Sequence, residues 1–191
     1  MKKLLLTLLA IGCLLTAYPQ GTVSFTNGDP LRGVNAPIYE SNGVTGLSGQ
    51  QFMAQLFAGP SANSLASIAM MGFSTGVTAG YFFGGTQTIN TVGGGDTAWI
   101  QVDVWNTGSG ASFPQAKASG LPDSWWQSSL FTVQTGNFLS GTGPTPPAAL
   151  TGLGTSPLFL NSVPEPSTFA LAGLAVVVML QTRRRTLRGG H

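Results

Sequence analysis

The chain has 191 residues, enough for one domain of ordinary size once two apolar ends are set aside. Its formal net charge is +2, but the middle, from 22 to 163, contains two basic and five acidic residues and therefore carries −3. This balance excludes a basic nucleic-acid-binding face on the folded domain. Abundant small polar residues, with enough large apolar ones for a core, predict a folded domain with an uncharged surface rather than a disordered chain.

The N-terminus has the composition of a secretory signal peptide. Two lysines at positions 2 and 3 precede the apolar run 4–15, and small residues follow up to Ala17. The pattern predicts a helical signal peptide over 1–17, cleaved after Ala17. The only cysteine, Cys13, lies inside the apolar run. The mature domain therefore has no disulfide, and its stability must come from burial and strand pairing.

Next in the chain, alternating hydrophobicity predicts β-strands over 22–140. In residues 99–105 three aliphatic side chains alternate with Trp99, Gln101, Asp103 and Trp105, as in a half-buried strand. The other predicted strands are 22–26, 51–58 and 129–135, with weaker ones at 67–72, 77–83 and 86–91. Glycine-rich and Asn-Gly turns separate them. About seven or eight short strands without a long helix predict an all-β fold, an antiparallel β-sandwich.

Two segments depart from the strand pattern. Within 106–128, Ser112 and Gln115 form a candidate capping box and Gly120 a candidate end for one short helix. The segment 141–162, rich in Pro, Gly, Ser and Thr, predicts a loop or linker. Proline lacks the donor that a central strand needs, so we expect no central strand at 143–147.

Residue chemistry argues against the commonest catalytic sites in the middle region. The only histidine is His191, so that region has neither His nor Cys for a Ser-His-Asp or Cys-His site or for a conventional zinc site. We expect no enzyme activity, no cofactor and no metal. A carboxylate glycosidase remains as a remote alternative, with Asp96 and Asp103 near one strand. Asp29, Asp96 and Asn90 are calcium-type ligands, but no Asp-x-Asp-x-Asp loop contains them, and turn positions suit them better.

Four tryptophans remain open to two interpretations. Trp99, Trp105, Trp125 and Trp126 could stack on sugar rings if they are exposed beside Asn, Gln and Asp side chains. Tryptophan is more often largely buried, with its N–H satisfied locally. A carbohydrate-binding module that contacts exopolysaccharide is thus an alternative to a purely structural protein.

The C-terminus has three parts in order. Val163, Pro164, Glu165 and Pro166 come first, an uncharged stretch follows to 182, and Arg183, Arg184 and Arg185 close it. The stretch 166–182 would extend about 25 Å as a helix, which is the short limit for a membrane span. The arginines place the C-terminal tail 186–191 in the cytoplasm, and the N-terminal lysines do the same for the other end. The region between the two ends is then outside the membrane.

This tripartite end resembles the PEP-CTERM sorting signal of Gram-negative bacteria. The resemblance implies that Pro164, Glu165 and Pro166 are recognised by a membrane protease, exosortase, in organisms that make exopolysaccharide. It also implies export machinery as a partner and delivery of the cargo to the cell surface or extracellular matrix. Residues 20–60 are similar to a recurring cargo type to which no activity is attached. We therefore expect an exported, non-catalytic surface or matrix protein, anchored transiently in the inner membrane.

Overall fold

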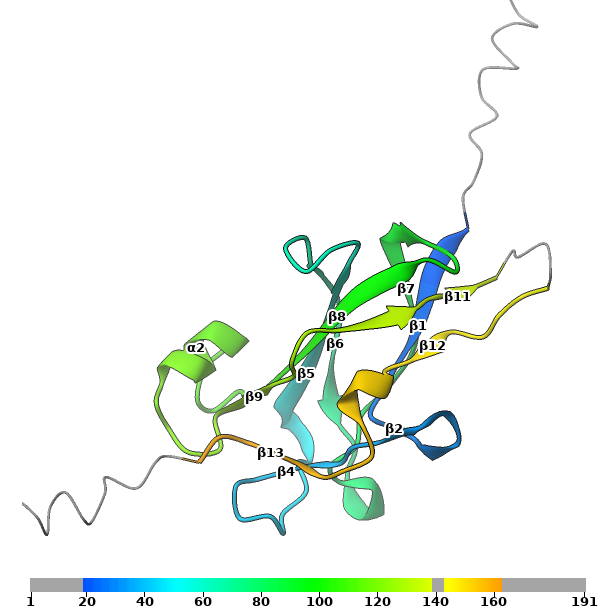
Figure 1. Cartoon of the computed structure of the whole chain (residues 1–191). Helices are drawn as coiled ribbons and strands as arrows, with labels where there is room; N and C mark the ends of the chain where they lie inside the picture. The colour runs from blue at the N-terminus through cyan, green and yellow to red at the C-terminus, as the bar shows by residue number, and fades with distance from the viewer. Residues whose placement is uncertain (1–18, 139–142, 163–191) are drawn as a thin grey trace, which may run out of the picture. The chain divides into compact units, whose positions relative to one another are not determined.

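A computed structural model describes residues 19–138 and 143–162 (Figure 1). The predicted signal peptide at 1–17, the predicted membrane helix and arginine cluster within 163–185, and the tail 186–191 lie outside these ranges. Contacts divide the chain into one unit that ends at Asn161 and a second from Ser162 to His191. The described part is mainly β-strand, which confirms the all-β prediction. No helix within it has the length and apolar character needed to cross a membrane.

The larger sheet is fully antiparallel and has the strand order β10-β8-β5-β6. Its long members are β5 (Gly49–Gly59), β6 (Ala66–Phe73) and β8 (Thr97–Asn106), and β10 (Phe131–Gln134) is shorter. Beyond β10, β9 (Trp125–Gln127) pairs with the same edge of β8. The alternation predicted for 99–105 is confirmed, because Ile100, Val102 and Val104 are fully buried.

The smaller sheet is built around β1 (Gln20–Thr26). Along one edge β1 pairs with the antiparallel β7 (Phe83–Gly93). It also pairs with β11 (Gly136–Asn137) and then, in parallel, with β12 (Ala148–Ala149). Figure 1 shows these strands gathered around β1. The two-residue pairing with β12 departs from the purely antiparallel prediction.

One apolar core joins the two sheets. It combines Val23 and Phe25 of β1 with Leu56 of β5 and Val102 of β8, all fully buried. Burial of such side chains contributes about 1.5–3 kcal/mol each to stability. Phe82, from the loop before β7, inserts between the sheets, and its ring centroid lies 4.9 Å from that of Phe25. The core therefore holds the domain together in the absence of any disulfide.

Short elements complete the domain at its margins. β2 (Gly28–Asp29) pairs with β3 (Val34–Asn35), and β4 (Ile38–Tyr39) pairs in parallel with β13 (Leu158–Phe159). Strands of the described ranges are connected by the 3-10 turns η1 (Pro30–Arg32), η2 (Gly76–Thr78) and η3 (Thr151–Leu153). The helix α2 (Phe113–Ala118) is the short helix predicted within 106–128.

Three details of the predicted fold are wrong. Of the predicted strand 77–83, only Phe83 lies in a strand, as the first residue of β7. Gly76 and Gly80 adopt positive φ, and the chain forms the turn η2 instead. Ser112 makes no side-chain cap bond at α2, so the predicted capping box does not form, although Gly120 follows the helix at positive φ as expected. The segment 148–161 is not a linker, since β12 and β13 pair with other strands and Leu150 is buried.

Candidate functional site

The outer face of the larger sheet, on the side opposite the core, carries three of the predicted site residues, Trp99, Asp103 and Trp105. Along β8 it presents Trp99, Gln101, Asp103 and Trp105. Their direct cross-strand partners on β5 are Gly59, Phe57, Gln55 and Met53, in that order. Side chains opposite each other in an antiparallel pair lie about 5 Å apart, so these eight positions form one continuous surface.

Trp105 is a packing residue and not a surface platform. Only 2% of it is exposed, because α2 covers it with Phe113 and Ala116, while Met53 and Trp125 pack at the sides. Its indole Nε1 has no hydrogen-bond partner within the described part of the chain. The interpretation of Trp105 as an exposed sugar contact is therefore wrong.

The other three tryptophans point in different directions. Trp126 lies opposite Val104 and packs against the main core, so it faces inward. Trp125 is partly exposed, but Lys117 Nζ lies 4.5 Å from its ring centroid in a cation–π contact. Trp99 is partly exposed at the far end of the outer face. The structure thus does not bring the four predicted tryptophans onto one platform.

Asp103 belongs to a short series of hydrogen-bonded polar side chains that leads to Lys117 of α2. Its Oδ1 accepts a hydrogen bond from Gln127 Nε2 at 2.9 Å, and Gln127 Oε1 accepts one from Lys117 Nζ at 3.1 Å. Burial raises the pKa of Asp103 above its ordinary value of 3.8, while the Gln127 bond and the Lys117 charge act in the opposite direction. The residue is only 5% exposed, which leaves little access for a substrate.

The remaining acids have local structural contacts. Asp29 forms an ion pair with Arg32 three residues on, and Asp123 accepts a hydrogen bond from the backbone N–H of Ser41. Asp96 directly precedes the extended β8 and lies seven positions before Asp103, which is about 23 Å along the strand. Glycosidase carboxyl groups lie about 5–9.5 Å apart. The Asp96–Asp103 pair does not meet that requirement.

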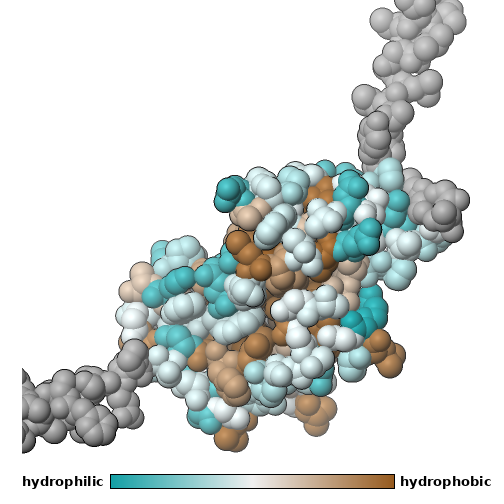
Figure 2. All heavy atoms as spheres, in the orientation of Figure 1, coloured by the Kyte–Doolittle hydropathy of each residue, from teal (hydrophilic) through white to brown (hydrophobic). Residues whose placement is uncertain are grey.

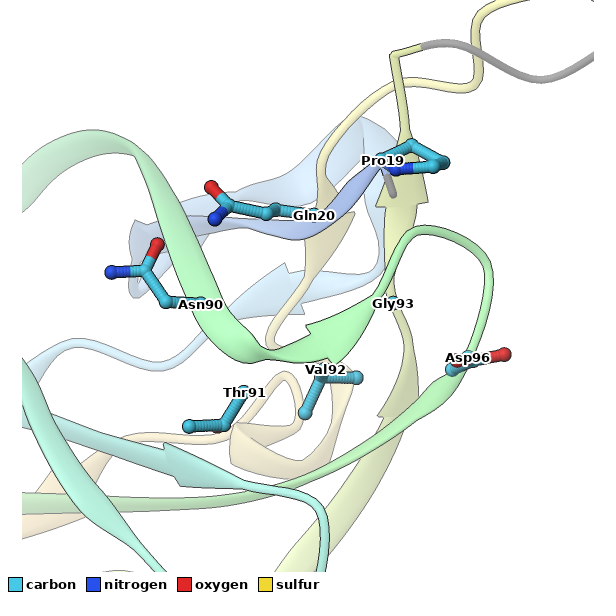
Figure 3. Close-up of a pocket in the computed structure, with 7 residues that line it drawn as sticks. All are labelled: Pro19, Gln20, Asn90, Thr91, Val92, Gly93 and Asp96. Carbon is cyan, nitrogen blue, oxygen red and sulfur yellow. The ribbon is translucent and has the colours of Figure 1, made fainter. Parts of the chain in front are cut away.

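A hollow of about 390 Å³ lies between the first residues of β1 and the last part of β7 (Figure 3). It brings together two of the suggested calcium ligands, Asn90 and Asp96. The side chains of Gln20 and Asn90 extend to the same side, whereas the Asp96 carboxylate points away from them (Figure 3). Within the described ranges, no group of three His, Cys, Asp or Glu side chains could hold a metal ion.

Asn161 fixes the end of the domain, a role that the sequence did not reveal. Its Oδ1 accepts hydrogen bonds from the backbone N–H groups of Ser124 and Trp125 at 3.0 and 2.8 Å. Its Nδ2 donates to Leu121 O at 3.0 Å, and its own backbone N–H donates to Trp125 O at 2.9 Å. The preceding Leu160 is buried in the core. The apolar run 158–160 was the available signal that this segment is part of the domain.

The segment that follows matches a known family model. The model describes the PEP-CTERM protein-sorting motif and covers residues 162–185. The chain carries a PEP-CTERM sorting motif. The matched range contains Val163, Pro164, Glu165, Pro166 and the arginines Arg183, Arg184 and Arg185, which confirms the resemblance. Neither the curated proteins nor the solved structures yielded a match to the chain.

Proposed function

We propose that this protein is an exported surface or matrix protein with no catalytic activity. In this proposal the PEP-CTERM motif holds it transiently in the inner membrane, where a membrane protease of the exosortase type recognises Pro164, Glu165 and Pro166. The observation that carries the proposal is the position of the motif, which starts at residue 162, directly after Asn161, a residue hydrogen-bonded to the domain.

This position would let processing leave the domain intact. Within the described part of the chain, Leu160 and Asn161 are the last residues with core or hydrogen-bonded contacts to the domain. A cut near Glu165 falls four residues beyond Asn161, so it would leave every buried side chain and every strand of the described ranges in place. The released cargo would keep both sheets and its core, which a surface protein requires for stability.

The surface chemistry also supports a non-catalytic role. Asp29 and Asp123 are engaged in local contacts, and Asp103 is buried. Most of the face seen in Figure 2 carries weakly polar residues, with apolar ones in separate groups. Neither His nor Cys occurs in residues 19–138 or 143–162. An uncharged polar surface of this kind suits contact with hydrated extracellular polymer.

Mass spectrometry of the mature protein from its natural host tests the proposal. We expect an N-terminus just after Ala17, a C-terminus near Glu165, and recovery from the surface or medium fraction. The variant Glu165→Ala should accumulate in the membrane fraction with its C-terminal arginines retained. Glu40→Ala, which removes a carboxylate outside the motif, should be processed normally. Recovery of wild-type chains in the cytosol with both tails intact would contradict the proposal.

A further inference from the structure

Part of the outer face of the larger sheet is left uncovered and has an unusual composition. We define the open strip as Trp99 and Gln101 of β8 with Gln55 and Phe57 of β5; all four side chains are partly exposed. A solvent-facing side of an antiparallel sheet is ordinarily polar. Here two aromatic rings alternate with two uncharged amides.

Neighbouring elements bound the open strip. Gly59, opposite Trp99, allows the β5–β6 hairpin to fold over this face, since a Cβ there would collide with the backbone carbonyl of Ser64. On the other side of Trp99, β10 contributes the exposed Thr132. At the opposite end, α2 covers the face at Trp105. Trp99 and Phe57 are diagonal neighbours between these limits, about 7 Å apart.

The amides of the open strip are positioned but retain free hydrogen-bonding capacity. Gln55 Nε2 donates to Ser67 Oγ at 2.7 Å, and Gln101 Nε2 donates more weakly to Ser128 O at 3.5 Å. Each bond uses one amide hydrogen, so the Oε1 acceptors remain available to a ligand. Fixed acceptors beside aromatic planes match a sugar ring, which presents C–H groups on its faces and hydroxyl groups at its edge.

The charges around the open strip indicate which class of polysaccharide it would bind. Residues 41–95 contain no Asp, Glu, Lys or Arg, so β5 and β6 carry no charge. The carboxylate nearest to the open strip, Asp103, is almost completely buried and bonded to Gln127. A net charge of −3 over 22–163 would repel an acidic polymer. The recognised chemistry is therefore that of an uncharged polysaccharide.

We propose that the open strip binds a neutral polysaccharide, with Trp99 and Phe57 stacking on sugar rings and Gln55 and Gln101 accepting hydrogen bonds from hydroxyl groups. The proposal rests on the proposed export, because such polymers lie outside the cell. It also replaces the predicted set of four tryptophans with a surface in which only Trp99 remains.

Affinity electrophoresis of the full-length chain tests this inference. Three neutral polymers, a soluble β-glucan, a galactomannan and a xylan, are compared with acidic alginate. We expect retardation by at least one neutral polymer and none by alginate. Trp99→Ala should weaken the interaction about tenfold or more, as truncation of a central aromatic contact does. Phe138→Ala removes an exposed ring remote from the strip in sequence and should leave binding unchanged.

Gln101→Ala provides a second variant whose folding does not depend on the Trp99 ring, and it should also weaken binding. Absence of retardation by all three neutral polymers would overturn the inference, as would unchanged binding by both variants. Stronger retardation by alginate, or a dimer that only Trp99→Ala dissociates, would overturn it in favour of another occupant. None of these outcomes depends on where the protein is located, so failure here is distinguishable from failure of the export proposal.

Discussion

Asn27 connects three segments of the domain through one buried side chain. Its Nδ2 donates to Ala36 O at 2.8 Å and Gly80 O at 2.9 Å, and its Oδ1 accepts from the backbone N–H of Phe82 at 2.8 Å. In sequence it resembles an ordinary Asn-Gly turn. Its role depends on partners up to 55 residues away, which no local pattern shows.

Asn27→Ala should therefore destabilise the domain strongly. It leaves the Phe82 N–H donor and the Ala36 carbonyl acceptor without partners, at about 1–3 kcal/mol each. Gly80 O loses one of its two bonds and keeps the one from Ile38 N–H. We expect the free energy of unfolding in urea to fall by about 3 kcal/mol or more. The control Asn63→Ala removes an exposed amide and should change it by less than about 0.5 kcal/mol. Equal effects of the two variants would show that the Asn27 bonds are not important.

Asp103 should make stability depend on pH. Because burial raises its pKa in the native state, the native protein takes up a proton before the unfolded chain does as pH falls. The stabilisation is then fully present below the unfolded-state pKa near 3.8 and is lost as pH rises through the raised native value. At neutral pH the native state carries the cost of a buried charge.

Asp103→Asn should consequently raise the melting temperature at pH 7. Its amide oxygen can still accept the hydrogen bond from Gln127, and no charge is buried. The difference from wild type should shrink as pH is lowered through the native-state pKa of Asp103, as thermal melts between pH 7 and 4 would show. Asp96→Asn controls for the loss of one negative charge. A lower melting temperature for Asp103→Asn at pH 7 would mean that the carboxylate is net stabilising.

At the scale of elements, α2 shows which helix signals matter. A Cβ at Gly110 would collide with the backbone N–H of Ala116, so this glycine lets the preceding loop approach the helix. Ser112, two residues later, makes no cap bond. The helix is held mainly by the burial of Phe113 and Ala116 over Trp105. Tertiary packing thus replaces the capping box that the sequence suggested.

Two substitutions in the same loop should lower the stability of the domain by very different amounts. Gly110→Ala should displace α2 and lower the free energy of unfolding by about 1–3 kcal/mol through overpacking. The displacement should expose Trp105 to solvent and shift the tryptophan emission to longer wavelength. Ser112→Ala should change stability by only a few tenths of a kcal/mol, although a working N-cap contributes about 1 kcal/mol. Urea unfolding followed by fluorescence measures both. A loss of 1 kcal/mol for Ser112→Ala would show that the cap forms in solution.

Strands with strict two-residue alternation were predictable, and elements set by tertiary contacts were not. β8 follows directly from the alternation around Val102, and β5 from 51–58. The run 77–83 has strand-forming residues but no clean alternation, and the positive φ of Gly76 and Gly80 was not visible in sequence. For the candidate site, the sequence correctly predicted that Trp99 and the aliphatic residues of β8 lie on opposite faces of the sheet. The cover over Trp105 was not, because it depends on how a helix packs.

For the whole molecule, the boundary between cargo and sorting motif should be sharp. A chain that ends after Ser162 retains β13, Leu160 and Asn161, and we expect it to unfold at the same urea concentration as the processed protein. A chain that ends after Pro157 loses the β4–β13 pair and the Asn161 hydrogen bonds. It should be less stable by several kcal/mol. If the two truncated chains were equally stable, the domain would end at or before Pro157 and not at Asn161.

Two strand pairs of the described domain are parallel, β1 with β12 and β4 with β13. They join residues near the start of the domain to residues more than a hundred positions later. Strand pairs between such distant residues make folding slow, because the long intervening chain loses conformational entropy before the stabilising contacts form. Until residue 161 has been synthesised, the nascent polypeptide lacks its closing strands. The nascent chain should therefore remain unfolded enough to pass through a translocation pore. It can complete its native structure only after β13 has crossed the membrane.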